Sequence, residues 1–249
     1  MPAQNIDIVF LIDASESMLP CFNALRSHLE NFLAPMQGGT GQTIRLGLLA
    51  HAAGYDQRGS SVYDHIFIGG RGLSMLKKLY TQKGCDEDFF TTNPEKFKIA
   101  VGKVECKGNE EMLVALDTAL DFPFGQSMNT RRVVVMFSNE KLEDGIDKGK
   151  FNSRIPELIQ KIHDRKITLF ACLPDSEGAC ELAGADGSEI VDNEGGEHAW
   201  DKIDFGKLLA QMGKSISCSS LQAISEPSYR RGLFGQENWV AGGCIVTGE

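Results

Sequence analysis

The sequence lacks several features that would place it in a common functional class. None of its apolar runs approaches membrane-spanning length, and the N-terminus has no basic stretch followed by an apolar core. No block of lysine and arginine is longer than a few residues, and the formal net charge is −9. Phosphate binding needs clustered positive charge, so nucleic acid is not an expected partner. We expect a soluble cytoplasmic protein that binds neither nucleic acid nor a membrane.

Several motifs of metal and enzyme chemistry are also missing. None of the seven cysteines falls in a Cys-x-x-Cys pair or a cysteine–histidine spacing typical of zinc sites, which fits free thiols in a reducing compartment. Cys21 and Cys172 are expected to pack on a helix and at a strand end. The first strand is followed by no glycine-rich turn, and the chain has no P-loop or GxSxG motif. Dinucleotide enzymes, P-loop NTPases and serine hydrolases are therefore disfavoured.

What the sequence does contain is an alternation of apolar strands and amphipathic helices. Nearly continuous apolar runs predict buried parallel strands at 6–12, 44–50, 132–137 and 166–173. Apolar residues three and four positions apart predict helices at 22–32, 112–120, 155–162 and 205–212. Asn93 followed by Pro94 predicts the start of another helix, which continues to about residue 104. This alternation predicts a doubly wound α/β fold, with a mostly parallel sheet and helices on both faces.

Three segments depart from this alternation. Residues 60–70 alternate apolar and polar side chains, as in an edge strand, which we predict to be antiparallel. An irregular insertion follows at about 69–90 and includes one short helical piece, LSMLKKLY. Residues 216–249 are rich in serine and glycine and have no sustained period. We therefore predict one domain over 1–215, followed by a tail that docks on it or is flexible.

A cluster of small oxygen-bearing side chains follows the first strand, in DIVFLIDASESM. Asp13, Ser15 and Ser17 occupy alternate positions, so they project to one side of an extended chain. They lie beyond the carboxyl end of the strand, where open α/β sheets bind ligands. One carboxylate and two hydroxyls are hard oxygen ligands suited to Mg²⁺ or Mn²⁺. Helix capping is the alternative, and it explains Ser17 before a helix near Pro20 but not the alternating set.

DIVFLIDASESM resembles the first motif, DxSxS, of the von Willebrand factor A (vWA) domain, the fold that carries a metal-ion-dependent adhesion site. The resemblance covers nearly the whole chain except the tail, and it implies two further metal positions. When Ala115-Leu116 in KGNEEMLVALDTAL is aligned with the Ala-Leu of the family, Glu110 takes the place of a threonine, with Glu111 one residue away. Asn139 in VVVMFSNEKLEDG stands where the family has an aspartate.

These two departures from the family pattern leave the state of the site open. If Glu110 binds the ion directly, it takes the place of a partner's acidic residue, and docking through the metal weakens. If Glu110 points to solvent, the site is short of ligands and its affinity for metal falls. Asn139 is then either an indirect ligand or a plain turn residue. A metal-free interaction surface is the alternative to a bound ion.

An enzyme is the least favoured interpretation of the same aspartate. Mg²⁺-dependent phosphohydrolases of α/β fold also place an aspartate at the end of the first strand, and they need a second carboxylate two residues later. That position is Ser15 here, so the general acid is missing and Asp13 is not expected to be a nucleophile. His51 ends the second strand near the same edge and is predicted to be a hydrogen-bonded strand-end residue, with lining of the site as the alternative. We predict no catalytic activity.

The resemblance implies a stand-alone bacterial domain whose protein partner docks at the edge holding Asp13. In bacteria, such domains work beside AAA+ ATPases of the MoxR type, or beside associated effectors, in assembly or defence systems. The alternative is a metal-independent scaffold whose C-terminal tail binds the partner or is cut by a protease. The tail segments YRRGLFG and NWVAGGCIV carry aromatic and aliphatic residues that a free tail does not need.

Overall fold

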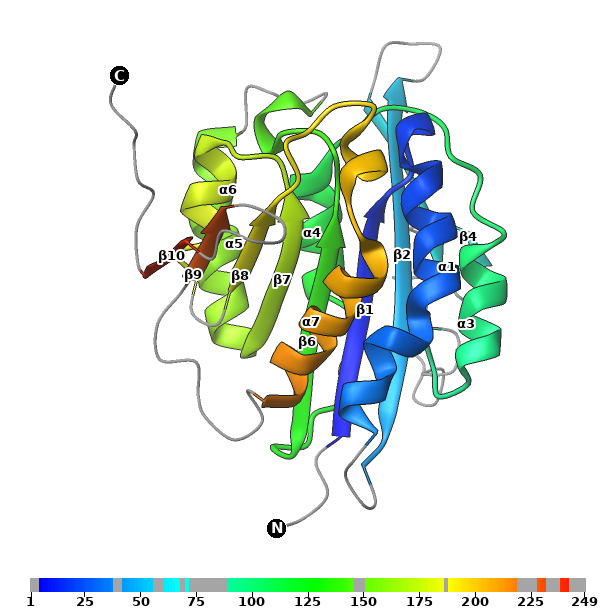
Figure 1. Cartoon of the computed structure of the whole chain (residues 1–249). Coiled ribbons are helices and arrows are strands. Elements are labelled where there is room, and N and C mark those ends of the chain that lie inside the picture. The colour runs from blue at the N-terminus through cyan, green and yellow to red at the C-terminus, as the bar shows by residue number, and fades with distance from the viewer. Residues whose placement is uncertain are drawn as a thin grey trace.

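The structure is a computed structural model, and it describes residues 5–37, 42–55, 61–67, 70–71, 89–145, 151–185, 188–218, 228–231 and 238–241. A mostly parallel sheet forms its centre, with the strand order β10-β9-β8-β7-β6-β1-β2-β3-β4 (Figure 1). The strands are β1 (Asn5–Asp13), β2 (Ile44–Tyr55), β3 (Ser61–Phe67), β4 (Gly70–Arg71), β5 (Phe90–Thr91), β6 (Thr130–Phe137), β7 (Ile167–Leu173), β8 (Glu189–Asp192), β9 (Ser228–Arg231) and β10 (Asn238–Ala241). Strands β2, β1, β6, β7, β8 and β9 run parallel, and β3 pairs antiparallel with β2.

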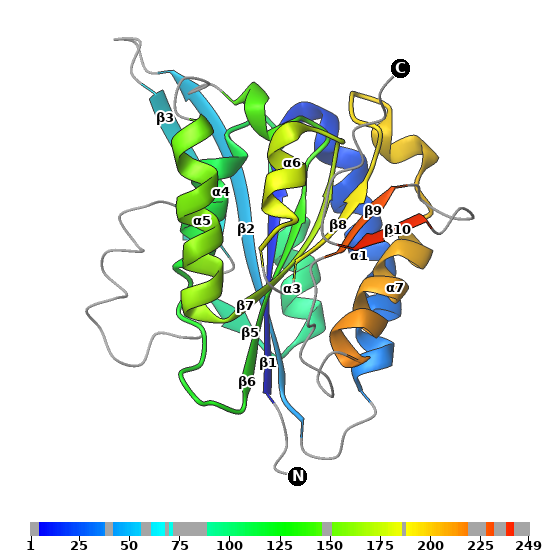
Figure 2. The same cartoon turned by 90° about the vertical axis from the view of Figure 1, so that its left-hand side faces the viewer.

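Helices cover both faces of this sheet. They are α1 (Leu19–Leu33), α3 (Pro94–Val101), α4 (Met112–Leu120), α5 (Phe151–Arg165), α6 (Glu177–Leu182) and α7 (Phe205–Cys218). Short 3₁₀ turns are η1 (Glu16–Met18), η2 (Ala34–Met36), η4 (Leu142–Asp144) and η6 (Ala199–Lys202). Helices α1, α3 and α7 lie on one face, and α4, α5 and α6 lie on the other (Figures 1 and 2). Among the described helices, none is long and apolar enough to cross a bilayer.

The two-sided covering explains why the strands read as continuous apolar runs. In β1, Ile8 and Phe10 belong to the hydrophobic cluster under α1 and α7, whereas Val9 and Leu11 belong to the cluster under α4 and α5. All four side chains are fully buried. Successive residues of a strand point to opposite faces, so a sheet covered on both sides needs apolar residues at every position. The predicted doubly wound α/β fold is confirmed.

Most predicted elements are present, and the differences lie at their ends and in short strands. The Asn93 side chain caps α3 by accepting hydrogen bonds from the backbone N–H groups of Glu95 and Lys96, as predicted. The helix ends at Val101, before Gly102, rather than near residue 104. The predicted antiparallel strand is β3. It is not the edge strand, because β4 pairs with its outer side. The piece LSMLKKLY lies outside the described residues. Strand β8, helix α6 and the tail strands β9 and β10 were not predicted.

The cysteines follow the expectation only in part. Cys21 and Cys172 are buried in the cluster under α1, as predicted, and these two and the half-buried Cys106 are free thiols. Burial raises the pKa of Cys106 to about 11, with the charge of Asp13 as a second cause. Cys180, in contrast, is disulfide-bonded, so the expectation that all the cysteines are free thiols is wrong.

Helices α1 and α7 touch through their backbones at one point. At Gly213 of α7, an added Cβ atom would overlap the carbonyl oxygen of Phe32 in α1. No residue other than glycine fits between the two helices here. The contact sets the spacing of these helices on the face of the sheet that carries the larger part of the aromatic core.

Candidate metal centre

Predicted site residues from two neighbouring strands meet at the carboxyl edge of the sheet. Asp13 is the last residue of β1, and the strand register places it beside His51 of β2. Strand β6 ends on the other side of β1, so Ser138 and Asn139 leave the sheet next to Asp13. Asp13 and Asn139 are 0% and 1% exposed. His51 is also fully buried, and its carbonyl accepts a hydrogen bond from the N–H of Ala14 at 2.7 Å.

A chain of hydrogen bonds links four of the five predicted ligands. The Asp13 carboxylate accepts from the Ser15 backbone N–H at 2.8 Å and from the Ser15 hydroxyl at 3.0 Å. The Ser15 Oγ lies 3.2 Å from the Ser17 Oγ. The Ser17 Oγ in turn lies 3.2 Å from Oδ1 and 3.0 Å from Nδ2 of Asn139. The alternating serines therefore converge with Asp13 and Asn139.

These hydrogen bonds decide against helix capping as the role of the serines. Ser15 is the N-cap residue of η1, and its side chain makes no capping hydrogen bond. The N-cap residue of α1 is Met18, which also makes none with its side chain. Both serine hydroxyls are instead directed to other members of the cluster. The capping interpretation of Ser17 is therefore wrong.

Glu110 reaches the same edge on a loop that is tied to β1 and β2. The backbone N–H of Lys107 donates to the carbonyl of Ala14 at 2.5 Å, and Ala53 and Asn109 exchange two backbone hydrogen bonds of 2.7 Å. Gly108 makes the turn possible, because its φ is +88° and an added Cβ atom would lie 2.7 Å from the Ala53 carbonyl oxygen. The half-buried Glu110 is thus held beside the end of β1.

The two carboxylates at this edge repel one another. Burial raises the pKa of Asp13 to about 7, hydrogen bonds from Ser15 oppose the rise, and the charge of Glu110 adds to it. Burial also raises the pKa of Glu140, and the charges of Glu110, Asp144 and Glu197 act in the same direction. No cation of the described chain contributes to either shift. Within the part of the chain that the structure describes, the negative charge of this edge is therefore not balanced by a cation.

Two neighbouring residues differ from what the sequence suggested. Ser138, which was not among the predicted ligands, is fully buried and directs its hydroxyl to Oδ2 of Asp13 at 3.4 Å. Its place directly after β6, at the edge where β1 also ends, is the signal that would have identified it. Glu111 is buried as the first residue before α4, and its carboxylate packs against Gly145. Of the two glutamates, Glu110 is therefore the one that acts on Asp13.

The side chain of Asn139 is held from the loop that follows β8. Its Nδ2 donates to the carbonyl of Gly196 at 3.0 Å, and the backbone carbonyl of Asn139 accepts from the Gly196 N–H at 2.9 Å. Glu194, Gly195 and Gly196 all have positive φ values, of 62°, 70° and 81°. Asn193 fastens this loop by donating to the Ser138 carbonyl at 2.7 Å. Asn139 is therefore a fixed bridge between Ser17 and the loop rather than a plain turn residue.

The donor set fits a hard divalent cation. Among the described residues, no group of three or more His, Cys, Asp and Glu side chains has the arrangement of a metal site. The oxygens that do converge come from one buried carboxylate, two hydroxyls and an amide, with the Glu110 carboxylate close by. Mg²⁺ and Mn²⁺ accept such oxygens and keep several waters. The unbalanced negative charge of Asp13 is what such an ion would neutralise.

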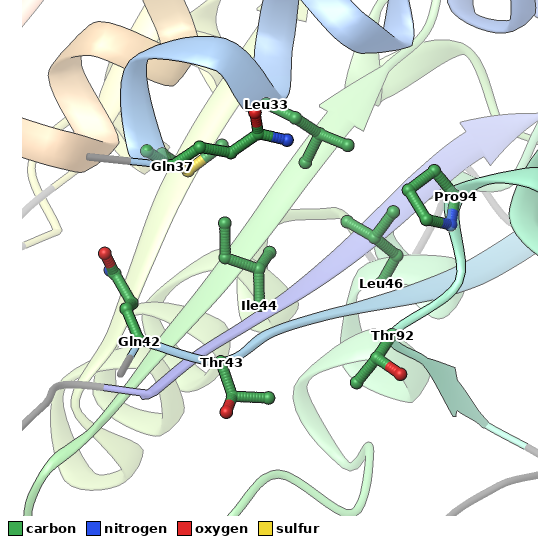
Figure 3. Close-up of a pocket in the computed structure, with 9 residues that line it drawn as sticks. Leu33, Gln37, Gln42, Thr43, Ile44, Leu46, Thr92 and Pro94 are labelled. Carbon is green, nitrogen blue, oxygen red and sulfur yellow. The ribbon is translucent and has the colours of Figure 1, made fainter. Parts of the chain in front are cut away.

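A pocket of about 310 Å³ lies at the opposite end of β2 and contains none of these residues (Figure 3). The end of α1, the start of β2 and the segment before α3 form its walls. Its lining is uncharged, and consists of Leu33, Met36, Gln37, Gln42, Thr43, Ile44, Leu46, Thr92 and Pro94. Ile44 pairs with Ile6 at the start of β1, whereas Asp13 ends that strand. The pocket is therefore separate from the candidate metal centre.

Comparison with known proteins supports the fold. No protein-family model and no curated protein matches the sequence. A von Willebrand factor type A protein from Catenulispora acidiphila aligns with a TM-score of 0.51 and 14% identity, covering 85% of this chain and 43% of that chain. The fold is that of a vWA domain. The open conformation of the pilus adhesin SpaC from Lactobacillus rhamnosus GG aligns with a TM-score of 0.51 and 13% identity, over 87% of this chain and 30% of the adhesin.

This chain thus spans less than half the length of either neighbour. At such low identity, the similarity establishes the architecture alone. The identity of the ligands at the sheet edge depends on the geometry of this chain's own residues.

Proposed function

We propose that this vWA-fold domain is a non-catalytic protein-interaction module whose partner docks at the edge holding Asp13, with Mg²⁺ or Mn²⁺ bound there. The observation that supports this function is the hydrogen-bonded series of oxygen donors from Asp13 through Ser15 and Ser17 to Asn139. Asp13 ends β1, Ser15 and Ser17 follow it, and Asn139 follows β6. The series therefore lies beyond the carboxyl ends of parallel strands, which is the position of ligand sites in open α/β sheets.

Asp13, Ser15 and Ser17 would hold the ion, and Asn139 would act through its Oδ1. Glu110 would either complete the shell or balance the charge from a short distance, and the pKa of Asp13 shows that the two carboxylates interact. A bound ion supplies positive charge at an otherwise acidic edge. It would offer an open position to an oxygen ligand of the partner if Glu110 does not fill that position.

The partner class follows from the resemblance to vWA domains. We propose a protein partner, either a AAA+ ATPase of the MoxR type or an effector that acts with it in a bacterial assembly or defence system. The test is co-purification of the chain with such an ATPase in Mg²⁺ and in EDTA. Binding that is lost in EDTA and in Ser17→Ala supports docking at the metal, whereas equal binding in both conditions would place the contact elsewhere.

The metal itself is tested by thermal and chemical unfolding with and without Mg²⁺ or Mn²⁺. Metal at about a hundredfold its dissociation constant is expected to stabilise the chain by about 2.7 kcal/mol. The double variant Ser15→Ala/Ser17→Ala should lose this gain. Ser27→Ala is a matched control, because the Ser27 hydroxyl is exposed and donates within α1, to the Asn23 carbonyl. An equal gain in the double variant and in the control would exclude the proposed ligands.

A further inference from the structure

The proposed metal centre lies at the carboxyl ends of the strands. The outer side of strand β8 is a different part of the sheet and takes no part in that centre. Strand β8 pairs on its inner side with β7, from Phe170↔Glu189 to Leu173↔Asp192. On its outer side it pairs with β9, which belongs to the C-terminal tail and lies beyond α7 in the chain. Strand β9 in turn pairs with β10, so the two strands form a hairpin at the outside of the sheet (Figure 1).

The contact of this hairpin with the domain is short. Strands β8 and β9 share the three pairs Glu189↔Ser228, Ile190↔Tyr229 and Val191↔Arg230. Strands β1 and β2, in contrast, pair continuously from Ile6↔Ile44 to Asp13↔His51. The hairpin also joins α7 through residues 219–227, so its pairing with β8 closes a loop at an entropic cost. Both features make the β8–β9 pair one of the weaker junctions of the sheet.

Removal of β9 would expose a strand edge that is ready to accept another strand. Ile190 and Val191 are 0% and 7% exposed, and their side chains belong to the two hydrophobic clusters. These contacts hold β8 extended, while its outer N–H and C=O groups would lose their partners. Such an edge binds extended peptides through main-chain hydrogen bonds.

We propose that the outer edge of β8 is a second docking site, which takes an extended strand of a protein partner in place of β9. The chain's own hairpin occupies the site and covers it until the partner strand displaces it. The occupant is an extended segment because β9 itself shows the geometry of the bound strand, parallel to β8 over three residues. The segment must be free of proline where it pairs, since every donor to β8 is a backbone N–H.

The test uses the full chain and a fluorescent peptide with the sequence of residues 226–241. In the full-length variant Tyr229→Pro/Arg230→Pro, adjacent residues of β9 lose their N–H groups, so pairing with β8 and with β10 is broken together. This variant is expected to bind the peptide at least tenfold more tightly than the wild-type chain in fluorescence anisotropy. All measurements omit thiol reductants, which would cleave the disulfide of Cys180.

Three comparisons make the result decisive. A control chain with Ala223→Pro/Ser225→Pro, which leaves the residues of β9 unchanged, should bind as the wild type does. A peptide with prolines at the positions of Tyr229 and Arg230 should not bind. Hydrogen exchange at residues 189–191 should be faster in the Tyr229→Pro/Arg230→Pro chain and slow again when the peptide is added. Equal affinity for wild type and variant, or binding of the proline peptide, would overturn the proposal.

Folding and the metal centre are checked separately. If the double-proline chain does not show the wild-type unfolding transition, the milder single variant Arg230→Pro replaces it, with a smaller gain in affinity expected. The Ser15→Ala/Ser17→Ala chain should bind the peptide as the wild type does, because those serines follow the end of β1 and do not pair with β8. Failure of metal binding and failure of strand exchange are therefore distinguishable.

Discussion

Two aspartates of β1, Asp7 and Asp13, are both completely buried, and their surroundings differ in charge. The Asp7 carboxylate receives the Arg45 guanidinium at 2.7 and 2.6 Å and the Gly125 N–H at 2.7 Å. Among the described residues, the donors to the Asp13 carboxylate are all neutral, and its pKa is raised to about 7. A buried carboxylate with its own cation completes the fold, whereas one without a cation favours an external one.

The largest expected effect comes from breaking the compensated pair. Arg45→Met keeps much of the side-chain length but leaves the Asp7 charge buried without its cation, which should cost about 3–5 kcal/mol of unfolding free energy. Denaturant unfolding at neutral pH measures this loss. Asp7→Asn in the Arg45→Met background should recover much of it. A loss below about 1 kcal/mol would show that Asp7 is solvated after all.

For Asp13, which has no such cation among the described residues, we expect that removal of the charge stabilises the folded chain at neutral pH. The pKa of Asp13 is higher in the folded chain than the ordinary value of 3.8, so the folded state holds the proton more tightly. Its contribution to stability is therefore present below about pH 4 and lost as the pH rises to about 7. A shift of this size corresponds to at most about 4 kcal/mol.

Asp13→Asn removes that pH dependence. In EDTA, the variant should be more stable than the wild type by roughly 2–4 kcal/mol at pH 7.5 and no more stable at pH 4. Chemical unfolding across this range checks the sign. In Mg²⁺ the difference in unfolding free energy between the variant and the wild type should become smaller or change sign, because only the wild type is stabilised by the ion. Greater stability of the wild type in EDTA at pH 7.5 would contradict the charge argument.

The loop that carries Glu110 is tested by a substitution at Gly108. Gly108→Ala places a side chain at a positive φ and against the Ala53 carbonyl, with an expected cost of about 2 kcal/mol. It should also weaken the Mg²⁺-induced shift, since the loop carries Glu110. Gly102→Ala is the matched control, because its φ of −70° is ordinary and its nearest neighbour is the side chain of Arg26. Similar losses in both variants would remove the special role of the loop.

The smallest expected effect concerns the side-chain amide of Asn139. Asn139→Asp removes the hydrogen bonds from Nδ2 to Ser17 and to the Gly196 carbonyl, so the metal-free chain should lose about 1–2 kcal/mol. The added charge should enlarge the stabilisation by Mg²⁺ in the same unfolding assay. A variant that is less stable without metal and gains nothing from it would show that Asn139 serves the loop alone.

The sequence predicted the start of the site better than its completion. Asp13, Ser15 and Ser17 follow a strand at alternate positions, so their convergence depends on local geometry alone. Ser138 and the bridge from Asn139 to Gly196 join loops that are far apart in the chain. No local pattern reports which way such side chains turn, and only the register of β1 and β6 brings them together.

The same distinction applies to the fold. Long apolar runs such as β1 and β6 carry their own signal, because both of their faces are buried. Strand β8 has only four residues, and β9 becomes a strand through its pairing with β8. Short strands of this kind are determined by their neighbours rather than by their own composition.

The glycine contact between α1 and α7 limits how the second helix can move. If α7 rotated and advanced by one residue along its own helical path, the Cβ atom of Met212 or of Lys214 would take the place of Gly213 beside the carbonyl of Phe32, where only glycine fits. Such a change of register is therefore sterically blocked while the two helices stay in contact. Helix α7 therefore either keeps its present register against α1 or must separate from α1 before it can shift.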